Sequence, residues 1–311
     1  MNTKQSLTAW AYFIGLSLIW GSSFILMKRG LEVFSAWQVA SLRMISAAIV
    51  LSFWAIRSFK NVPVSKIPIA FVGGLFSSFL PAFLFCAAQQ GINSSTAGIL
   101  NALTPSFTVL IGFLFFQQLI NLRLIIGLGI GLLGTLVLIL INPKGEIDLN
   151  RYALLVVLAT VCYGLNLNWV KRHIGNIKPL DFTVIALTFS GIIAFFVMLF
   201  TDLEGLVAGV TNQPNAFVGI MILGILGTAL AQVALNKLIN LAGAVFASAN
   251  TYAIPVVAIL WGIYDGETLL LWHFLGMLLI FISISILNKK DKKENQIQVA
   301  KKETNLCSIE D

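Results

Sequence analysis

Arg43 stands inside a long apolar stretch of the sequence, about seven residues from its start. A guanidinium in hydrocarbon costs at least several kcal/mol unless it reaches water or finds hydrogen-bond partners. Two interpretations fit this position. Arg43 is either the counter-ion of a bound substrate carboxylate or a structural hub that donates to backbone carbonyls. In both cases its side chain must face protein or water.

A second group of small and polar residues recurs at helical spacing in another apolar segment. Residues three and four apart share one face of a helix, so this group predicts a stripe that runs through the segment. The stripe either lines a cavity or supplies interhelical hydrogen bonds and close packing. Its members are Ala97, Asn101, Thr104 and Thr108.

Pro105 lies within the segment that carries this stripe, directly after Thr104, and Pro255 occupies a similar place late in the chain. A proline inside a helix frees a backbone carbonyl and permits a bend, so both residues are candidate hinges. Asn250 and Thr251 precede the second proline and are candidate binding residues beside Asn101 and Thr104.

Aromatic and amide side chains near the starts of the two halves could stack on an organic substrate or clamp it. These residues are Trp20, Tyr163, Asn166 and Trp169. For Trp20 and Trp169 an aromatic belt at the lipid headgroups is an equally good interpretation. The glutamines at segment ends, Gln89, Gln90 and Gln232, could be gate residues or ordinary interfacial residues.

Residues for catalysis or metal binding are not gathered anywhere in this sequence. The acids fall in loops, at segment ends or in the tail, and His173 and His273 lie in or beside two different loops. The three cysteines are scattered, without disulfide or metal-ligand spacing. We therefore expect no enzyme, no metal and no cofactor. An exporter of cationic drugs usually needs a carboxylate inside the membrane, so a zwitterionic, neutral or anionic metabolite fits better.

The elements that position these residues must be membrane-spanning helices. Hydrophobic residues make up 58% of the chain and charged residues 11%, against about 25% charged in soluble proteins. A spanning helix needs roughly 20 apolar residues. The sequence predicts an all-α polytopic protein of ten transmembrane helices, near 9–27, 34–56, 67–88, 95–116, 122–141, 151–170, 181–200, 216–238, 243–264 and 269–288.

The positive charges predict the orientation of these helices, because lysine and arginine are retained on the cytoplasmic side. With the N-terminus inside, most of them and the lysine-rich tail lie on that side, and only Lys28, Arg29, Lys144 and Arg151 face outward. Both termini are thus expected in the cytoplasm. The net charge of +7 is explained by topology, and we expect no nucleic-acid partner. The apolar-poor segment 289–311 is expected to be a disordered tail.

The chain contains an internal repeat. Residues 20–29 align without gaps on 163–172, and residues 95–105 align on 245–255 with the two prolines matched. Each copy holds five predicted helices, so the second must enter the membrane upside down, as in many secondary transporters. The expected units are 1–142 and 143–288, two inverted five-helix repeats.

Trp20, Gly21 and Phe24, together with Arg43 and the prolines Pro105 and Pro255, resemble the EamA-type family of the drug/metabolite transporter superfamily. The resemblance covers roughly residues 8–288. It implies ten helices in the bacterial inner (plasma) membrane, both termini in the cytoplasm, and export of amino acids or related metabolites. One position departs from the family: a glutamate is common just after the fourth helix, where this chain has Gln117 and Gln118, while the second copy keeps Glu267.

We therefore predict a transporter that exports a small metabolite by alternating access, with membrane lipid as its surroundings. The sequence leaves open a multidrug or other organic-solute exporter of the same fold, or a membrane protein that does not transport. Gly127 and Gly131 have GxxxG spacing, which allows close helix packing within the monomer or a homodimer seam.

Overall fold

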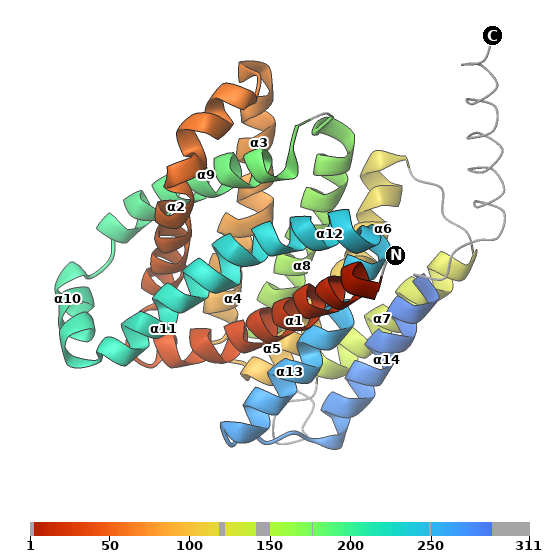
Figure 1. The fold of residues 1–311 in the computed structure, drawn as a ribbon. Coiled ribbons are helices and arrows are strands. Elements are labelled where there is room, and N and C mark those ends of the chain that lie inside the picture. The colour runs from red at the N-terminus through yellow and green to blue at the C-terminus, as the bar shows by residue number, and fades with distance from the viewer. Residues whose placement is uncertain (1–2, 118–121, 141–149, 176, 249, 288–311) are drawn as a thin grey trace, which may run out of the picture.

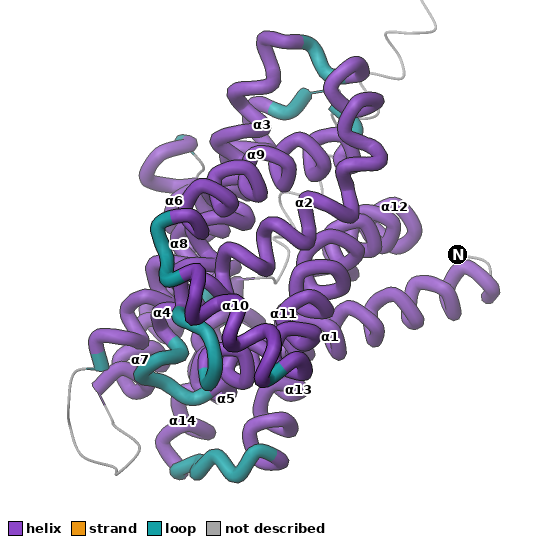
Figure 2. Tube along the Cα trace, turned by 90° about the vertical axis from the view of Figure 1, so that its left-hand side faces the viewer, coloured by secondary structure: helices purple, strands orange, loops and turns teal. Residues whose placement is uncertain are grey.

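The computed structural model describes residues 3–117, 122–140, 150–175, 177–248 and 250–287, and the regular elements in these ranges are all helices (Figures 1 and 2). The first half holds α1 (Thr3–Leu31), α2 (Ala36–Asn61), η1 (Val64–Lys66), α3 (Ile67–Gly74), η2 (Leu75–Phe79), α4 (Leu80–Ala88), α5 (Ser94–Asn101), α6 (Thr104–Phe116) and α7 (Leu122–Leu140). The second half holds α8 (Arg151–His173), α9 (Pro179–Leu199), α10 (Leu203–Asn212), α11 (Pro214–Gly224), η3 (Ile225–Leu230), α12 (Ala231–Ser248), α13 (Asn250–Tyr264) and α14 (Leu271–Leu287).

The chain is an all-α membrane protein. In the described residues seven helical segments are long and apolar enough to cross a membrane, and three shorter apolar helices accompany them at 122–138, 253–264 and 271–283. Large apolar side chains cover the outside, with Phe53 exposed at 84% and Phe200 at 90%. Such a surface would aggregate in water and suits contact with lipid. The expected tail 289–311 lies outside the described residues.

Contacts between loops define two ends of the molecule. At the α8–α9 end, the Nζ of Lys66 donates to the carbonyl of His173 at 2.8 Å, which joins the α2–α3 connection to the end of α8. At the α13–α14 end, the Nδ2 of Asn150 donates to the carbonyl of Gly91 at 3.3 Å, which joins the start of α8 to the α4–α5 loop. Figure 1 shows the α2–α3 connection at the top and the α13–α14 connection at the bottom.

Local sequence explains how α2 begins at the α13–α14 end. The hydroxyl of Ser35 accepts from the amide of Gln38, and the Oε1 of Gln38 accepts from the amide of Ser35, which is a capping box. The Nε2 of Gln38 also donates to the carbonyl of Asp202 at 2.7 Å, so the same residue ties α2 to the turn between α9 and α10. Beyond this point α2 packs along α9, where Gly191 lies so close to Ala48 that a Cβ would overlap it.

The two halves carry the same irregularity at matched positions. A π-helical segment interrupts the third apolar helix at Leu75–Phe79 and its counterpart at Ile225–Leu230. The sequence separation between Pro105 and Pro255 equals the separation between the starts of these two segments. The two halves therefore have their helical irregularities at matched positions, in addition to a similar hydropathy pattern.

The structure corrects three of the expected helix boundaries. The turn expected between 238 and 243 does not occur, because α12 continues to Ser248 and α13 begins at Asn250. The segment 95–116 breaks after Asn101 into α5 and α6. The expected loop 201–215 contains α10, which begins where the side chain of Asp202 accepts from the amide of Gly205.

Candidate functional site

A cavity of about 850 Å³ lies between the two halves of the chain. Its walls come from matched positions in the two copies, so each half contributes an equivalent surface with different side chains. The matched wall residues are Trp20 with Tyr163, Ser23 with Asn166, Phe24 with Leu167, Met27 with Val170, Arg43 with Ala186, Met44 with Leu187, Ser77 with Gly227, Ser78 with Thr228, Phe85 with Leu235, Asn101 with Thr251 and Thr104 with Ile254. Equivalent positions of the two repeats therefore form the walls of the cavity.

Arg43 of α2 faces this cavity. Its Nε donates to the hydroxyl of Thr228 at 2.9 Å, and its Nη1 lies 4.0 Å from the sulfur of Met27. In the described residues the guanidinium has no acidic partner within ion-pair distance. Arg43 and Lys178 are the charged residues on the described wall, so the cavity is electropositive. A guanidinium with free N–H groups can hold a carboxylate through two parallel hydrogen bonds.

Trp20 and Tyr163 lie on the wall as well. The Nε1 of Trp20 donates to the carbonyl of Gly227 at 3.1 Å, which fixes the indole against η3. In η3 and η2 the π-helical register alters the backbone bonding that a regular helix would make, and such segments are common at functional sites. The aromatic faces beside Arg43 can hold the apolar part of a small organic molecule.

The polar stripe of the first half meets the cavity in its middle. Asn101 and Thr104 are on the wall, and the hydroxyl of Thr104 donates to the carbonyl of Asn101 at 2.9 Å. Ala97 is fully buried in the helix packing, while the hydroxyl of Thr108 donates back to the carbonyl of Thr104 at 2.8 Å. The stripe therefore serves both the cavity and the packing.

Two of the candidate binding residues lie elsewhere. The Nε1 of Trp169 donates to the carbonyl of Ile69 at 3.1 Å, and its ring packs at a tilt against His173 with centroids 4.1 Å apart. The Nδ2 of Asn250 donates to Ser17 and to the carbonyl of Phe13, both at 2.8 Å. Neither residue is on the described cavity wall.

The two candidate hinges have different surroundings. Pro105 lies in the first turn of α6, directly after the break that separates α5 from α6. Pro255 lies inside α13 without such a break. The GxxxG glycines pack within the monomer: the hydroxyl of Ser283 in α14 donates to the carbonyl of Gly127 at 2.6 Å, and a Cβ at Gly131 would meet the same hydroxyl.

Sequence reasoning missed the wall residues Ser77, Ser78, Gly227 and Thr228. Small residues in an apolar run give no signal by themselves. The spacing that matches Pro105 with Pro255 also matches Ser78 with Thr228, so extending the repeat alignment toward the N-terminus would have found them. Gln232 lies on the wall, while the Nε2 of Gln89 donates to the carbonyl of Phe24 at 2.9 Å.

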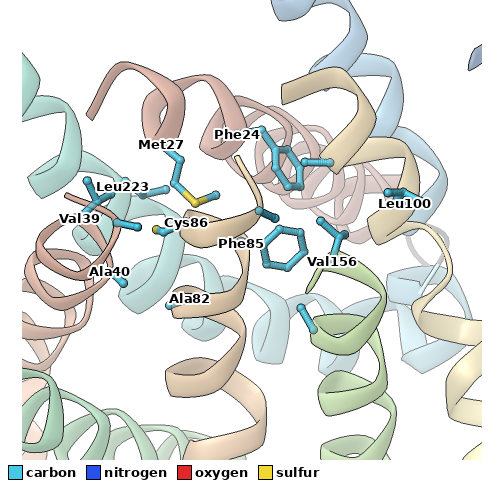
Figure 3. Close-up of a cluster of buried hydrophobic side chains, with 14 of the residues drawn as sticks. Phe24, Met27, Val39, Ala40, Ala82, Phe85, Cys86, Leu100, Val156 and Leu223 are labelled. Atoms are coloured by element: carbon cyan, nitrogen blue, oxygen red, sulfur yellow. The ribbon is translucent and has the colours of Figure 1, made fainter. Parts of the chain in front are cut away.

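The cavity does not reach the α13–α14 end, because apolar side chains close it there. The rings of Phe24 and Phe85 meet edge to face with centroids 5.7 Å apart (Figure 3). Beside them in the same buried cluster, Cys86 is fully buried and Met27 is exposed at only 1%. Along α1 and α4 this apolar layer separates the cavity from the charged residues beyond it.

Those charged residues join the two halves at the α13–α14 end. The Nζ of Lys28 lies 2.6 Å from Asp265 and 2.9 Å from Glu267, and the guanidinium of Arg29 also pairs with Asp265. Glu267 accepts hydrogen bonds from the amides of Ser94 and Ser95 at 2.9 and 3.1 Å. It accepts from both of their hydroxyls at 2.6 Å. We call Lys28, Arg29, Ser94, Ser95, Asp265 and Glu267 the ion cluster.

Comparisons with known proteins match nearly the whole chain. The model of the EamA-like transporter family matches residues 7–140 and again 150–289. An uncharacterized inner membrane transporter of Escherichia coli K12, YedA, is 26% identical over 93% of this chain and 94% of its own. An uncharacterized transporter of Bacillus subtilis, YdfC, is 25% identical over 95% of each chain.

More distant similarities cover less sequence or show the fold alone. A probable amino-acid metabolite efflux pump of Escherichia coli K12 is 29% identical over 131 residues, 42% of each chain. One crystal structure matches 92% of this chain and 96% of its own with a TM-score of 0.56 and 18% identity, which shows a shared fold.

Proposed function

Because this chain belongs to the EamA-like transporter family, in the drug/metabolite transporter superfamily, we propose that it exports a small metabolite, an amino acid or a related compound, by alternating access. A transporter of this family is not an enzyme, and its substrate is a small molecule. Export of amino-acid metabolites is the named activity of a partial relative, not of this chain. The finer proposal rests on the cavity.

The proposed substrate class rests on the surroundings of Arg43. A half-buried guanidinium in a membrane-spanning helix is costly without an acidic partner, and a bound carboxylate would remove that cost. The wall carries no aspartate or glutamate in the described residues, so a cationic substrate would find no counter-charge. Aromatic and apolar side chains of Trp20, Phe24, Phe85 and Tyr163 suit the apolar part of the substrate.

We assign substrate contact to the candidate residues on the wall, which are Trp20, Arg43, Asn101, Thr104, Tyr163, Asn166 and Thr251. For an amino acid, hydroxyl and amide oxygens of this set would accept from the ammonium group. The Oδ1 of Asn166 is buried without a hydrogen-bond partner in the structure and is available for this role. Trp169 and Asn250 remain sequence predictions, as do the hinges at Pro105 and Pro255.

The proposed topology has ten transmembrane helices in two inverted repeats, in a bacterial inner membrane, with both termini in the cytoplasm. The loop contacts support it, because successive connections of the chain alternate between the two ends of the molecule. The positive charges of Lys66, Lys171, Arg172 and Lys178 lie at the α8–α9 end, which then faces the cytoplasm. On this topology the cavity opens toward the cytoplasm.

Counterflow in proteoliposomes tests the function. A panel of amino acids, other carboxylates, nucleobases, sugars and cationic drugs should give exchange with a carboxylate. Arg43→Ala should then reduce exchange at least about tenfold, since charge-assisted hydrogen bonds contribute about 1.5–3 kcal/mol, and Arg43→Lys should retain part of it.

The matched control is Arg57→Ala, which removes an exposed arginine from the same helix. It should leave both exchange and protein abundance unchanged. Normal exchange by Arg43→Ala, or exchange confined to cationic drugs, would contradict the proposed substrate class.

A further inference from the structure

We propose that the ion cluster is the outer gate of this transporter, and that no equivalent charged lock forms among the described residues of the cytoplasmic side, so that the resting state is open to the cytoplasm. The inference rests on the proposed alternating access. The inference adds to alternating access the residues that keep the outer side closed, and it predicts which of the two states is preferred.

The shape of the cavity supplies the first argument. At the α8–α9 end its wall includes Ile174, Gly175, Ile177, Lys178 and Pro179. The matched residues of the first half, 31–36 in the α1–α2 connection, are absent from the described wall. Two halves with equivalent walls in the centre thus differ at their ends, which is the arrangement of an alternating-access protein caught open on one side.

The ion cluster supplies the second argument, because it joins parts that must separate for the other side to open. Lys28 belongs to the first half, and Asp265 and Glu267 belong to the second. Glu267 also holds the start of α5, whose unpaired amides and helix dipole favour a carboxylate. The side chain of Glu267 is exposed at 2% and that of Asp265 at 5%, so water competes little for these bonds.

The depth of the cluster supplies the third argument. It lies beyond Phe24 and Phe85, which end the cavity, because Lys28 follows Phe24 by about one helical turn in α1. A substrate leaving toward the α13–α14 end would have to pass both layers. Opening would then expose the acids to water, which can replace the lost hydrogen bonds.

Comparison of the two repeats shows how the described residues of the cytoplasmic side differ from the ion cluster. Lys171 and Arg172 match Lys28 and Arg29, but the position matched to Glu267 is Gln117. The guanidinium of Arg172 lies 5.8 Å from the ring centroid of Phe116, next to Gln117, and forms no ion pair in the described residues.

Asp181 lies at the same end of the molecule but is engaged elsewhere. It accepts from the hydroxyl of Ser58 at 2.7 Å and from Asn61 at 3.3 Å. In the described part of the chain, the basic pair Lys171 and Arg172 therefore has no carboxylate that could close the cytoplasmic side as Glu267 closes the other.

Cysteine labelling tests the gate without a known substrate. Ser23 on the cavity wall is changed to Cys in a chain whose native cysteines are replaced by Ala, and an anionic, membrane-impermeant methanethiosulfonate is added to whole cells. Labelling should be slow with the gate intact. Glu267→Gln and, separately, Lys28→Gln should each raise the rate about tenfold, because losing one partner of a buried pair raises the outward-open fraction.

The matched control is Glu204→Gln, an exposed acid on α10 that belongs to no ion pair in the described residues, and its rate should not change. Labelling of each variant in inside-out vesicles shows that it is folded. Rates for Glu267→Gln and Lys28→Gln equal to that of the intact gate would overturn the proposal.

The second half of the proposal predicts a gain of function. Gln117→Glu places a carboxylate beside Arg172 at a residue whose φ of 55° is no harder for glutamate than for glutamine. It should raise outside labelling of Ser23→Cys severalfold and lower it from the cytoplasmic side, and Arg172→Gln in the same chain should cancel both changes. No change with Gln117→Glu would refute the missing lock.

These outcomes separate the gate from the transport function. Labelling shifts with no counterflow substrate found would support the gate and leave the proposed substrate class in question. Exchange that depends on Arg43, together with unchanged labelling rates, would support the transport function and contradict the proposed gate.

Discussion

The pKa of Glu267 reflects the hydrogen bonds and the ion pair that this residue makes in the ion cluster. Burial raises the pKa of its carboxyl group, but hydrogen bonds from the hydroxyls of Ser94 and Ser95, from Lys28 and from the amide of Ser95 outweigh burial and hold the pKa at about 2. In an unfolded chain the pKa of a glutamate is about 4.3. A lowered pKa means that ionised Glu267 stabilises the fold above pH 4.3 and that this contribution is lost as the pH falls toward 2.

The prediction is that Glu267→Gln loses stability at pH 7 and little at pH 2. The free energy of unfolding of Glu267→Gln should be lower than that of the unchanged chain by about 3 kcal/mol at neutral pH. This difference should fall to roughly half near pH 3. Thermal unfolding of the detergent-purified protein across this pH range measures it, with Glu204→Gln as the control. A stability difference that stays constant from pH 7 to pH 2 would show that the hydrogen bonds, not the charge, dominate.

Helical spacing explains which candidate site residues the sequence could identify. Asn166 is on the cavity wall, and Trp169, three residues later, donates to the carbonyl of Ile69 in α3. Thr251 is on the wall, and its neighbour Asn250 points toward Phe13 of α1. The repeat pointed to these segments, but which of their residues face the cavity depends on helix rotation, which tertiary packing decides.

At the scale of elements, hydropathy predicted the apolar helices and missed their internal register. A window of about 19 residues averages over a π-helical segment such as Leu75–Phe79 and over the break between α5 and α6. It also placed a turn near 240 where α12 continues as helix. These features depend on which carbonyl each amide meets, and composition does not encode that.

The pairing of α7 with α14 gives a prediction at this scale. A side chain at Gly131 would collide with Ser283, whereas a Cβ at Gly129 meets no atom within 4 Å. Gly131→Leu should therefore cost about 1–3 kcal/mol through overpacking, while Gly129→Leu should be neutral or slightly stabilising. Thermal unfolding of the purified variants decides it, and equal stabilities would mean that these glycines serve another contact, such as a homodimer seam.

At the scale of the whole molecule, the repeat predicted two related halves, and the structure adds that they are not equivalent. Matched positions carry Trp20 and Tyr163, Asn101 and Thr251, or Glu267 and Gln117. The first two pairs keep a similar character on the cavity wall, and the third does not. Similar central residues allow one site to serve both states, while the unlike pair at the ends biases the equilibrium between them.

If the halves move as rigid bodies, opening one end must close the other, and this separates alternating access from a leak pore. Spin labels at Lys178 and Lys237 report on the cytoplasmic mouth, since the segments around both line the cavity, and labels at Glu32 and Thr268 report across the ion cluster. In Glu267→Gln the first distance should shorten and the second lengthen, each by on the order of 5 Å, in equal fractions of molecules. Glu204→Gln should leave both distances unchanged. Lengthening across the ion cluster without shortening at the mouth would describe a chain that opens at both ends at once, and alternating access would have to be given up.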